Sequence, residues 1–128
     1  METERKIKVL IVDDYDLVRE NLTALLEAFE DFEVVGTTGD GHKLLSLCST
    51  CQPDVVLMDM FMPTMDGVEA TRLIHREFPQ IKVVILSMFT DSTLICDALN
   101  AGAISYLSKT GQLSEITKSV RDAYYGMW

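Results

Sequence analysis

The chain has 128 residues, 48% of them hydrophobic and 24% charged, a size and composition typical of one domain with its own apolar core. Its formal net charge of -9 at pH 7 argues against contact with phosphate backbones, because nucleic-acid binders need cationic faces. We therefore expect this segment to make no direct contact with nucleic acid.

Membrane and redox signals point to the cell interior. No apolar run reaches the roughly 18 residues that a bilayer span requires, and the opening METERK does not begin a signal peptide. The three cysteines, Cys48, Cys51 and Cys96, lack metal-ligand spacing, which indicates reduced thiols. We expect a cytoplasmic protein without membrane contact.

Five short apolar runs along the chain predict strands. They are residues 7–12 (IKVLIV), 33–37 (EVVGT), 54–58 (DVVLM), 81–86 (IKVVIL) and 103–107 (AISYL). Between the first two runs, apolar residues from Leu17 to Phe29 recur at three- and four-residue spacing, which is typical of a helix with one buried face. Similar stretches separate the later runs, with turn signals at their ends.

This alternation predicts an α/β domain. Nearly uninterrupted apolar strands favour a parallel sheet covered by helices on both faces. Five such units commonly form a flavodoxin-like (βα)5 doubly wound domain with a five-stranded sheet in the order 2-1-3-4-5. Ligands of such sheets bind at the carboxyl ends of the strands. We expect a single domain over residues 1–128.

Polar residues follow four of the predicted strands. Asp13 and Asp14 come after the first strand, Asp59 after the third, Ser87 after the fourth and Lys109 after the fifth. Each alone has an ordinary structural explanation, such as a helix cap, a turn or a solvated side chain. Together they predict one crevice that contains carboxylates, a hydroxyl and an ammonium group.

Three neighbouring carboxylates repel one another unless a cation lies among them. Oxygen ligands without histidine or thiolate favour a hard ion, and a site with few protein ligands suits Mg²⁺, with Mn²⁺ as the alternative. Such a site suits phosphoryl transfer to an aspartate. Asp59 is the expected nucleophile because it stands alone on the central strand, whereas Asp13 and Asp14 can hold the metal.

Four segments resemble the receiver domain of two-component response regulators. They are VLIVDDYD, PDVVLMDMFMPTMDG, VVILSMF and AGAISYLSK, and the resemblance extends over about residues 7–124. It implies that Asp59 accepts the phosphoryl group, that Asp13, Asp14 and Asp59 bind Mg²⁺, and that the backbone carbonyl of Phe61 completes the metal site. It further implies that Ser87 and Lys109 bind the phosphoryl group and that Tyr106 rotates inward on activation.

The resemblance also implies partners and an output. The phosphoryl donor would be a sensor histidine kinase or a phosphotransfer protein, and phosphorylation could lead to a homodimer. Thr110 follows Lys109 where many receivers have a cis proline, so we expect a trans bond there. The Lys-Thr pair is similar to the NarL/FixJ branch, whose receivers usually precede a DNA-binding helix-turn-helix domain. Residues 125–128 would then begin the linker to that domain.

Phe61 and Phe89 differ from the family's usual residues. Each lies two positions beyond Asp59 or Ser87, where the family often has polar side chains that influence hydrolysis. The bulky rings either hinder an attacking water, which would give a long-lived acyl phosphate, or only cover the loop surface.

Two other functions compete with a phosphorylated receiver. A haloacid-dehalogenase phosphatase also uses an aspartyl nucleophile, but it needs an acid/base aspartate two residues later, where this chain has Phe61. The second is a pseudo-receiver, an interaction module that works without phosphorylation. The complete set of Asp13, Asp14, Asp59, Ser87 and Lys109 argues against this alternative.

Overall fold

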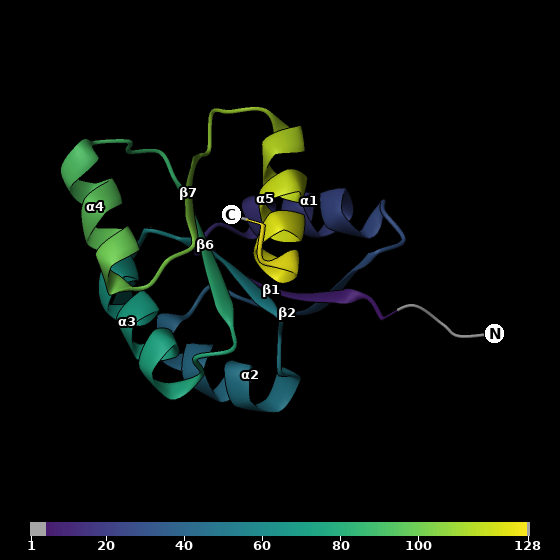
Figure 1. The fold of residues 1–128 in the computed structure, drawn as a ribbon, viewed down its shortest axis with the longest axis horizontal. Helices are drawn as coiled ribbons and strands as arrows, with labels where there is room; N and C mark the ends of the chain where they lie inside the picture. Colours follow the sequence, from purple (N-terminus) through teal and green to yellow (C-terminus); the bar gives the residue numbers. More distant parts are fainter. Residues whose placement is uncertain (1–4, 128) are drawn as a thin grey trace.

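Five parallel strands form the central sheet of the computed structural model, in which residues 5–127 are described (Figure 1). The strands are β1 (Ile7–Val12), β2 (Phe32–Thr38), β3 (Val55–Asp59), β6 (Lys82–Ser87) and β7 (Ser105–Ser108). Their order is β2-β1-β3-β6-β7, which is 2-1-3-4-5 when only the strands of this sheet are counted. The predicted flavodoxin-like fold and strand order are confirmed.

Helices cover both faces of the sheet. Figure 1 shows α1 and α5 on one side and α2, α3 and α4 on the other. The helices are α1 (Asp16–Glu27), α2 (Leu44–Cys51), α3 (Gly67–Glu77), α4 (Ser92–Ala101) and α5 (Leu113–Tyr125), with a short 3₁₀ turn η1 (Gly41–Lys43) before α2. Each strand connects to the next through a helix, as a parallel sheet requires.

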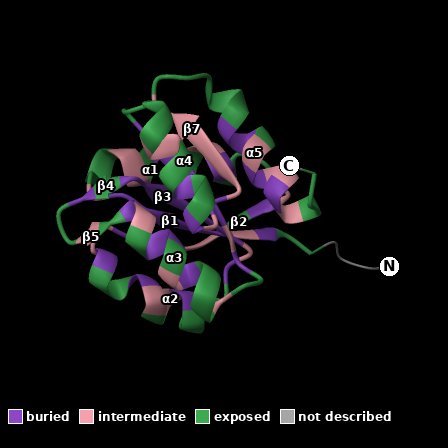
Figure 2. Ribbon diagram, turned by 60° about the vertical axis from the view of Figure 1, so that its left-hand side comes forward, coloured by how far each residue is buried: buried purple, intermediate pink, exposed green. Residues whose placement is uncertain are grey.

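The central strands are buried on both faces because successive side chains point to opposite sides of a strand. In β1, Val9 and Ile11 pack in the core beneath α1 and α5, whereas Leu10 and Val12 pack in the core on the other face. Figure 2 shows this distinction between buried strands and helices with exposed outer sides. The uninterrupted apolar runs in the sequence reflect this burial on both faces.

The segment after Asp59 forms a small hairpin that the sequence reading did not predict. Strands β4 (Phe61–Met62) and β5 (Met65–Asp66) pair in antiparallel fashion. Gly67 directly follows the hairpin. Its N–H donates to the Met60 carbonyl at 2.9 Å, and a Cβ there would lie only 2.5 Å from that oxygen. The Asp66 side chain accepts from the N–H of Val68 at 2.7 Å and so caps α3. The Met-Asp-Gly sequence thus closes the loop beside Asp59.

The remaining expectations compare with the structure as follows. Strand bounds shift by one or two residues, and β7 is a half-buried edge strand. Residues 5–127 contain no cis peptide bond, so the trans bond expected after Lys109 is confirmed. No helix among these residues is long and apolar enough to cross a membrane. Two of the expectations concern residues outside the described chain. Residues 1–4 belong to the METERK stretch, from which we expected no signal peptide, and residue 128 belongs to the expected linker.

Candidate functional site

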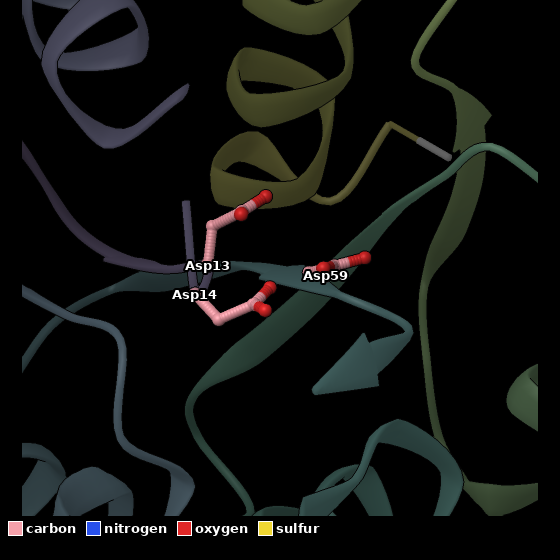
Figure 3. Close-up of side chains that lie close together, drawn as sticks. All are labelled: Asp13, Asp14 and Asp59. Carbon is pink, nitrogen blue, oxygen red and sulfur yellow. The ribbon is translucent and has the colours of Figure 1, made fainter. Parts of the chain in front are cut away.

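The carboxyl edge of the sheet brings together the residues that the sequence placed after the strands. Asp13 and Asp14 follow β1, Asp59 ends β3, Ser87 ends β6 and Lys109 follows β7. Since β1 pairs with β3 and β3 with β6, these strand ends are neighbours. Carboxylate oxygens of the three aspartates lie within 4.8 Å of one another, and Figure 3 shows their side chains in this cluster.

Lys109 links two of these carboxylates across the site. Its Nζ donates to Asp13 Oδ2 at 2.7 Å and lies 3.3 Å from Asp59 Oδ1. All three side chains are largely buried, so water screens their charges weakly. Three carboxylates with one ammonium leave an excess of two negative charges when all are ionised, which is the charge that a divalent cation neutralises.

Burial and charge shift the proton equilibria of the site. Burial raises the pKa of Asp59 above its ordinary 3.8, and the Asp13 charge adds to this rise against the opposing effect of Lys109. Burial alone would lower the pKa of Lys109, but the Asp13 hydrogen bond and the charges of Asp59 and Asp13 outweigh it, so this pKa lies above 10.5. Lys109 therefore remains an ammonium group at neutral pH.

The environment of the Asp14 carboxylate is a separate observation that fits a metal ion in this cluster. Its Oδ1 is buried and has no hydrogen-bond partner among the described residues. A buried carboxylate oxygen without a partner is costly, and coordination to a cation would remove that cost. The donors are oxygen atoms only, which suits Mg²⁺ or Mn²⁺ better than a soft metal.

Ser87 and Tyr106 both bind the loop that follows β6. The buried Ser87 Oγ accepts from the N–H of Phe89 at 3.0 Å. The Tyr106 hydroxyl donates to the carbonyl oxygen of the same residue at 2.5 Å. Ser87 and Tyr106 thus both contact the backbone of Phe89.

Phe61 and Phe89 form an aromatic pair beside Asp59. Their ring centroids lie 5.2 Å apart with an interplanar angle of 84°, an edge-to-face arrangement. Both residues line a cavity of about 500 Å³ whose other lining residues include Asp59 and Lys109. The N–H of Phe61 points to Asp59 Oδ1 at 3.4 Å. The role of its carbonyl oxygen as a metal ligand stays a prediction.

Three residues of the site escaped the sequence reading. The N–H of Tyr15 donates to Asp13 Oδ1 at 3.0 Å, and Tyr15 lines the cavity together with Met88. Arg19 donates to the backbone carbonyl of Asp13 and to the carboxylate of Asp16. The three-residue spacing of Asp16 and Arg19 could have indicated their ion pair. Nothing in the sequence pattern indicated the contact of Arg19 with Asp13.

Comparisons with known proteins identify the family of this chain. The model of the response regulator receiver domain matches residues 9–121. The chain belongs to the response regulator receiver domain family. The transcriptional regulatory protein LiaR of Bacillus subtilis is 43% identical over 120 residues, which cover 94% of this chain and 57% of LiaR. The response regulator protein VraR of Staphylococcus aureus is 41% identical with the same coverage.

Solved structures agree with this assignment. The receiver domain of the response regulator NarL from Mycobacterium tuberculosis superposes with a TM-score of 0.90 at 32% identity and covers 96% of this chain and 99% of that domain. These similarities place the receiver in the NarL/FixJ branch, as the sequence predicted. The chain spans a little over half the length of LiaR and VraR, which are named as regulators.

Proposed function

We propose that this receiver is a phosphorylation switch in which Asp59 accepts a phosphoryl group. The observation that carries this proposal is the bridging position of Lys109, which contacts Asp13 and Asp59 beside a cluster of three carboxylates. That arrangement concentrates negative oxygen ligands and one fixed positive charge around a single buried carboxylate.

The chemistry is a displacement at phosphorus. An Asp59 carboxylate oxygen forms a bond to phosphorus while the bond from phosphorus to the donor breaks, and the bonding electrons leave with the donor. Lys109 stays protonated and neutralises charge on the phosphoryl oxygens. Apart from the bond to Asp59, the chain only positions these groups. The domain would therefore assist its own phosphorylation and dephosphorylation, and it would not act as an enzyme on other molecules.

Asp13, Asp14 and Asp59 would hold Mg²⁺, or Mn²⁺ in its place, with the Phe61 carbonyl as a further ligand. The ion supplies neutralisation of the phosphoryl oxygens when it is bound. The chain itself fixes Asp13 through the Tyr15 N–H and through Lys109, so one ligand is preorganised.

The switch would act through the loop after β6. A phosphoryl group on Asp59 offers acceptor oxygens to the Ser87 hydroxyl, which in this structure accepts from the Phe89 N–H. Turning the hydroxyl toward the phosphoryl group loosens that contact and favours the inward position of Tyr106. A full change of state needs roughly 5 kcal/mol of differential binding, toward which charge-assisted hydrogen bonds contribute.

The partners follow from the proposed chemistry and the relatives. The donor would be a phosphohistidine on a sensor histidine kinase or phosphotransfer protein, and phosphorylation would favour a homodimer. LiaR is named a transcriptional regulatory protein, so we propose transcription control through a helix-turn-helix domain in the full-length protein. Residues 125–128 would begin the linker, although α5 includes Tyr125. The whole protein would work in the cytoplasm.

Incubation with acetyl phosphate and Mg²⁺, followed by intact-protein mass spectrometry, tests the proposal. We expect the mass of one phosphoryl group to be added to the wild type and none to be added to Asp59→Asn. Asp66→Ser is the matched control, because serine retains the cap of α3 while a nearby carboxylate is removed.

The rival functions give different results in this experiment. Repeated hydrolysis of the donor without a stable adduct would indicate a phosphatase. No adduct and no turnover would indicate a pseudo-receiver. Labelling of Asp59→Asn at the wild-type level would show that Asp59 is not the acceptor.

A further inference from the structure

Two arginines form ion pairs across one turn of a helix, but their environments differ. On α3, Arg72 pairs with Glu69 at 2.7 Å, and both side chains are 54% exposed. On α1, Arg19 pairs with Asp16, and its side chain is only 19% exposed while that of Asp16 is 86% exposed. An ion pair with so exposed a carboxylate is weak, so it does not by itself account for the burial of Arg19.

The second partner of Arg19 is the peptide bond between Asp13 and Asp14. Its Nη1 donates to the Asp13 carbonyl oxygen, while Nη2 donates to the Asp16 carboxylate. That carbonyl belongs to the peptide unit that joins two of the proposed metal ligands. A guanidinium holds its N–H groups in one plane, so two bonds from it fix the direction of the carbonyl more closely than a single flexible donor would.

Asp13 and Asp14 depend on this peptide to different degrees. The N–H of Asp13 donates to the Thr38 carbonyl at 3.0 Å, and its carboxylate accepts from the Tyr15 N–H and from Lys109. The buried Oδ1 of Asp14 has no partner among residues 5–127. Its position therefore depends on the backbone that carries it, and a rotation of the Asp13–Asp14 peptide would turn this oxygen relative to the other carboxylates.

The loop after β2 leaves space for the Arg19 guanidinium. A Cβ added at Gly39 would lie 2.5 Å from Arg19 Nη1 and 3.3 Å from the Asp13 carbonyl oxygen. Gly39 is not among the glycines with positive φ, so its backbone conformation does not require glycine. The absence of a side chain at this position instead allows the contact between Arg19 and Asp13.

We propose that Arg19 is a positioning residue that orients the Asp13–Asp14 peptide and thereby sets the affinity of the acidic cluster for Mg²⁺ or Mn²⁺. This inference rests on the metal site of the proposed function and adds a residue outside the three carboxylates. Loss of a group that holds a metal ligand in place typically weakens metal binding by about 10–100-fold.

The charge of Arg19 acts against this effect, which makes the proposal testable by the sign of the change. A cation near the cluster repels a divalent ion, so removal of its charge alone would strengthen metal binding. Removal of its hold on the Asp13 carbonyl would weaken metal binding. A neutral side chain at position 19 therefore gives opposite results under the two explanations.

Titration with Mn²⁺, followed by electron paramagnetic resonance of the free ion, measures the dissociation constant of each variant. We expect Arg19→Gln to bind Mn²⁺ roughly tenfold more weakly than the wild type, because glutamine is too short to reach the Asp13 carbonyl. Arg19→Lys keeps the charge and one flexible donor, so its loss should be smaller. Arg72→Gln is the matched control, because it also loses an ion pair across one helical turn, and it should bind Mn²⁺ as the wild type does.

Gly39→Ala tests the same contact with Arg19 left in the chain. The atom nearest to the new Cβ is at the end of the flexible Arg19 side chain, so the guanidinium should move away while the fold is kept. We expect weaker Mn²⁺ binding, in the same direction as in Arg19→Gln. Gly111→Ala is the control, because a Cβ there would meet no atom closer than 3.4 Å. Gly39→Ala and Arg19→Lys also provide the test if Arg19→Gln does not fold.

Urea denaturation in EDTA separates positioning from support of the fold. A role in folding alone predicts lower stability with a wild-type dissociation constant for Mn²⁺. That result, Mn²⁺ binding by Arg19→Gln at least as tight as in the wild type, or an equal loss in Arg72→Gln would overturn the proposal.

Failure of the metal site itself gives a different result. If the wild type does not bind Mn²⁺, or if Asp14→Asn binds it equally well, the proposed metal site and the role of Arg19 are both wrong. Binding that depends on Asp14 but not on Arg19 would leave the proposed function intact and remove only the positioning role.

Discussion

Two regions of this receiver each combine an edge-to-face phenylalanine pair with charged side chains. The charges are unbalanced in one region and balanced in the other. In the site, the Phe61–Phe89 pair lies beside three carboxylates and one ammonium group. At the α5 side of the molecule, the Phe29–Phe32 pair, with centroids 6.1 Å apart, lies beside one carboxylate, Asp31, and one guanidinium, Arg121.

In the second region, the carboxylate and the guanidinium neutralise each other. Arg121 binds both oxygens of Asp31, at 2.7 and 3.0 Å, and its guanidinium lies 4.9 and 4.8 Å from the centroids of Phe29 and Phe32. The hydrogen bond from Arg121 holds the pKa of Asp31 below 3.8, whereas burial raises that of Asp59. An unbalanced group of charges leaves binding capacity for a ligand, and a balanced one stabilises the fold.

The largest expected difference between the regions is their response to a divalent ion. Mg²⁺ at about 100 times its dissociation constant should stabilise the protein by roughly 2.7 kcal/mol, because the unfolded chain has no assembled site. Thermal unfolding of the wild type and Asp14→Asn with and without Mg²⁺ measures this effect. We expect most of the stabilisation to be lost in Asp14→Asn and kept in Asp91→Asn, whose carboxylate makes no capping hydrogen bond. Equal stabilisation of all three would place the ion elsewhere.

The second difference concerns water at the ring pairs. Phe61 and Phe89 line the cavity at Asp59, so we expect them to exclude water from the phosphoryl group. Phe61→Asn combined with Phe89→Glu should accelerate dephosphorylation by about tenfold, below the roughly 10²–10⁴-fold that a well-positioned acid–base group contributes. Loss of the label over time after donor removal measures the rate. An unchanged rate would leave the rings as a cover of the loop, and Phe29→Leu should leave the rate at its wild-type value.

The site region was easier to predict from sequence than the second region. Asp13, Asp59 and Lys109 could be placed together because each follows a buried strand, and the ends of parallel strands meet at one edge. No comparable rule connects Asp31 with Arg121, which lie 90 residues apart on a loop and a helix. Their contact depends on how α5 lies relative to the turn before β2.

The details within the site also depended on packing. The edge-to-face contact of Phe61 with Phe89 joins the β4 segment to the loop after β6, and sequence gave only their equal offsets from Asp59 and Ser87. The β4–β5 hairpin has two-residue strands, too short to produce a periodic pattern. The unpartnered Asp14 oxygen is a matter of side-chain orientation, which a spacing argument does not address.

A smaller effect should follow from disrupting the balanced region. Arg121→Ala removes the ion pair with Asp31 and the cation over two rings, and we expect a loss of about 1 kcal/mol of unfolding free energy. Urea denaturation measures it. Phosphorylation by acetyl phosphate should be unchanged, because Arg121 does not line the cavity at Asp59. A large fall in labelling would mean that the two regions are coupled.

The smallest effects, and the sharpest contrast, are the opposite pH dependences of Asp59 and Asp31. Folded Asp59 holds its proton more tightly than the unfolded chain does, so without metal its contribution to stability decreases as pH rises from 3.8 through its raised pKa. Asp31 has a lowered pKa, so its contribution is fully present above 3.8 and is lost as pH falls through that lowered value.

Urea denaturation in EDTA across this acidic range separates the two contributions. Asp59→Asn should remove the decrease above 3.8, and Asp31→Asn should remove the loss below it, which is about 0.2–1 kcal/mol for an exposed ion pair. Mg²⁺ should reverse the slope above 3.8 in the wild type, because the ion binds ionised carboxylates and makes their protonation costly. Mg²⁺ should leave unchanged the part of the pH dependence of stability below 3.8 that Asp31 causes, since this carboxylate is already paired with Arg121. The same slope change in Asp59→Asn would contradict the view that the unbalanced charge of the site is what the ion neutralises.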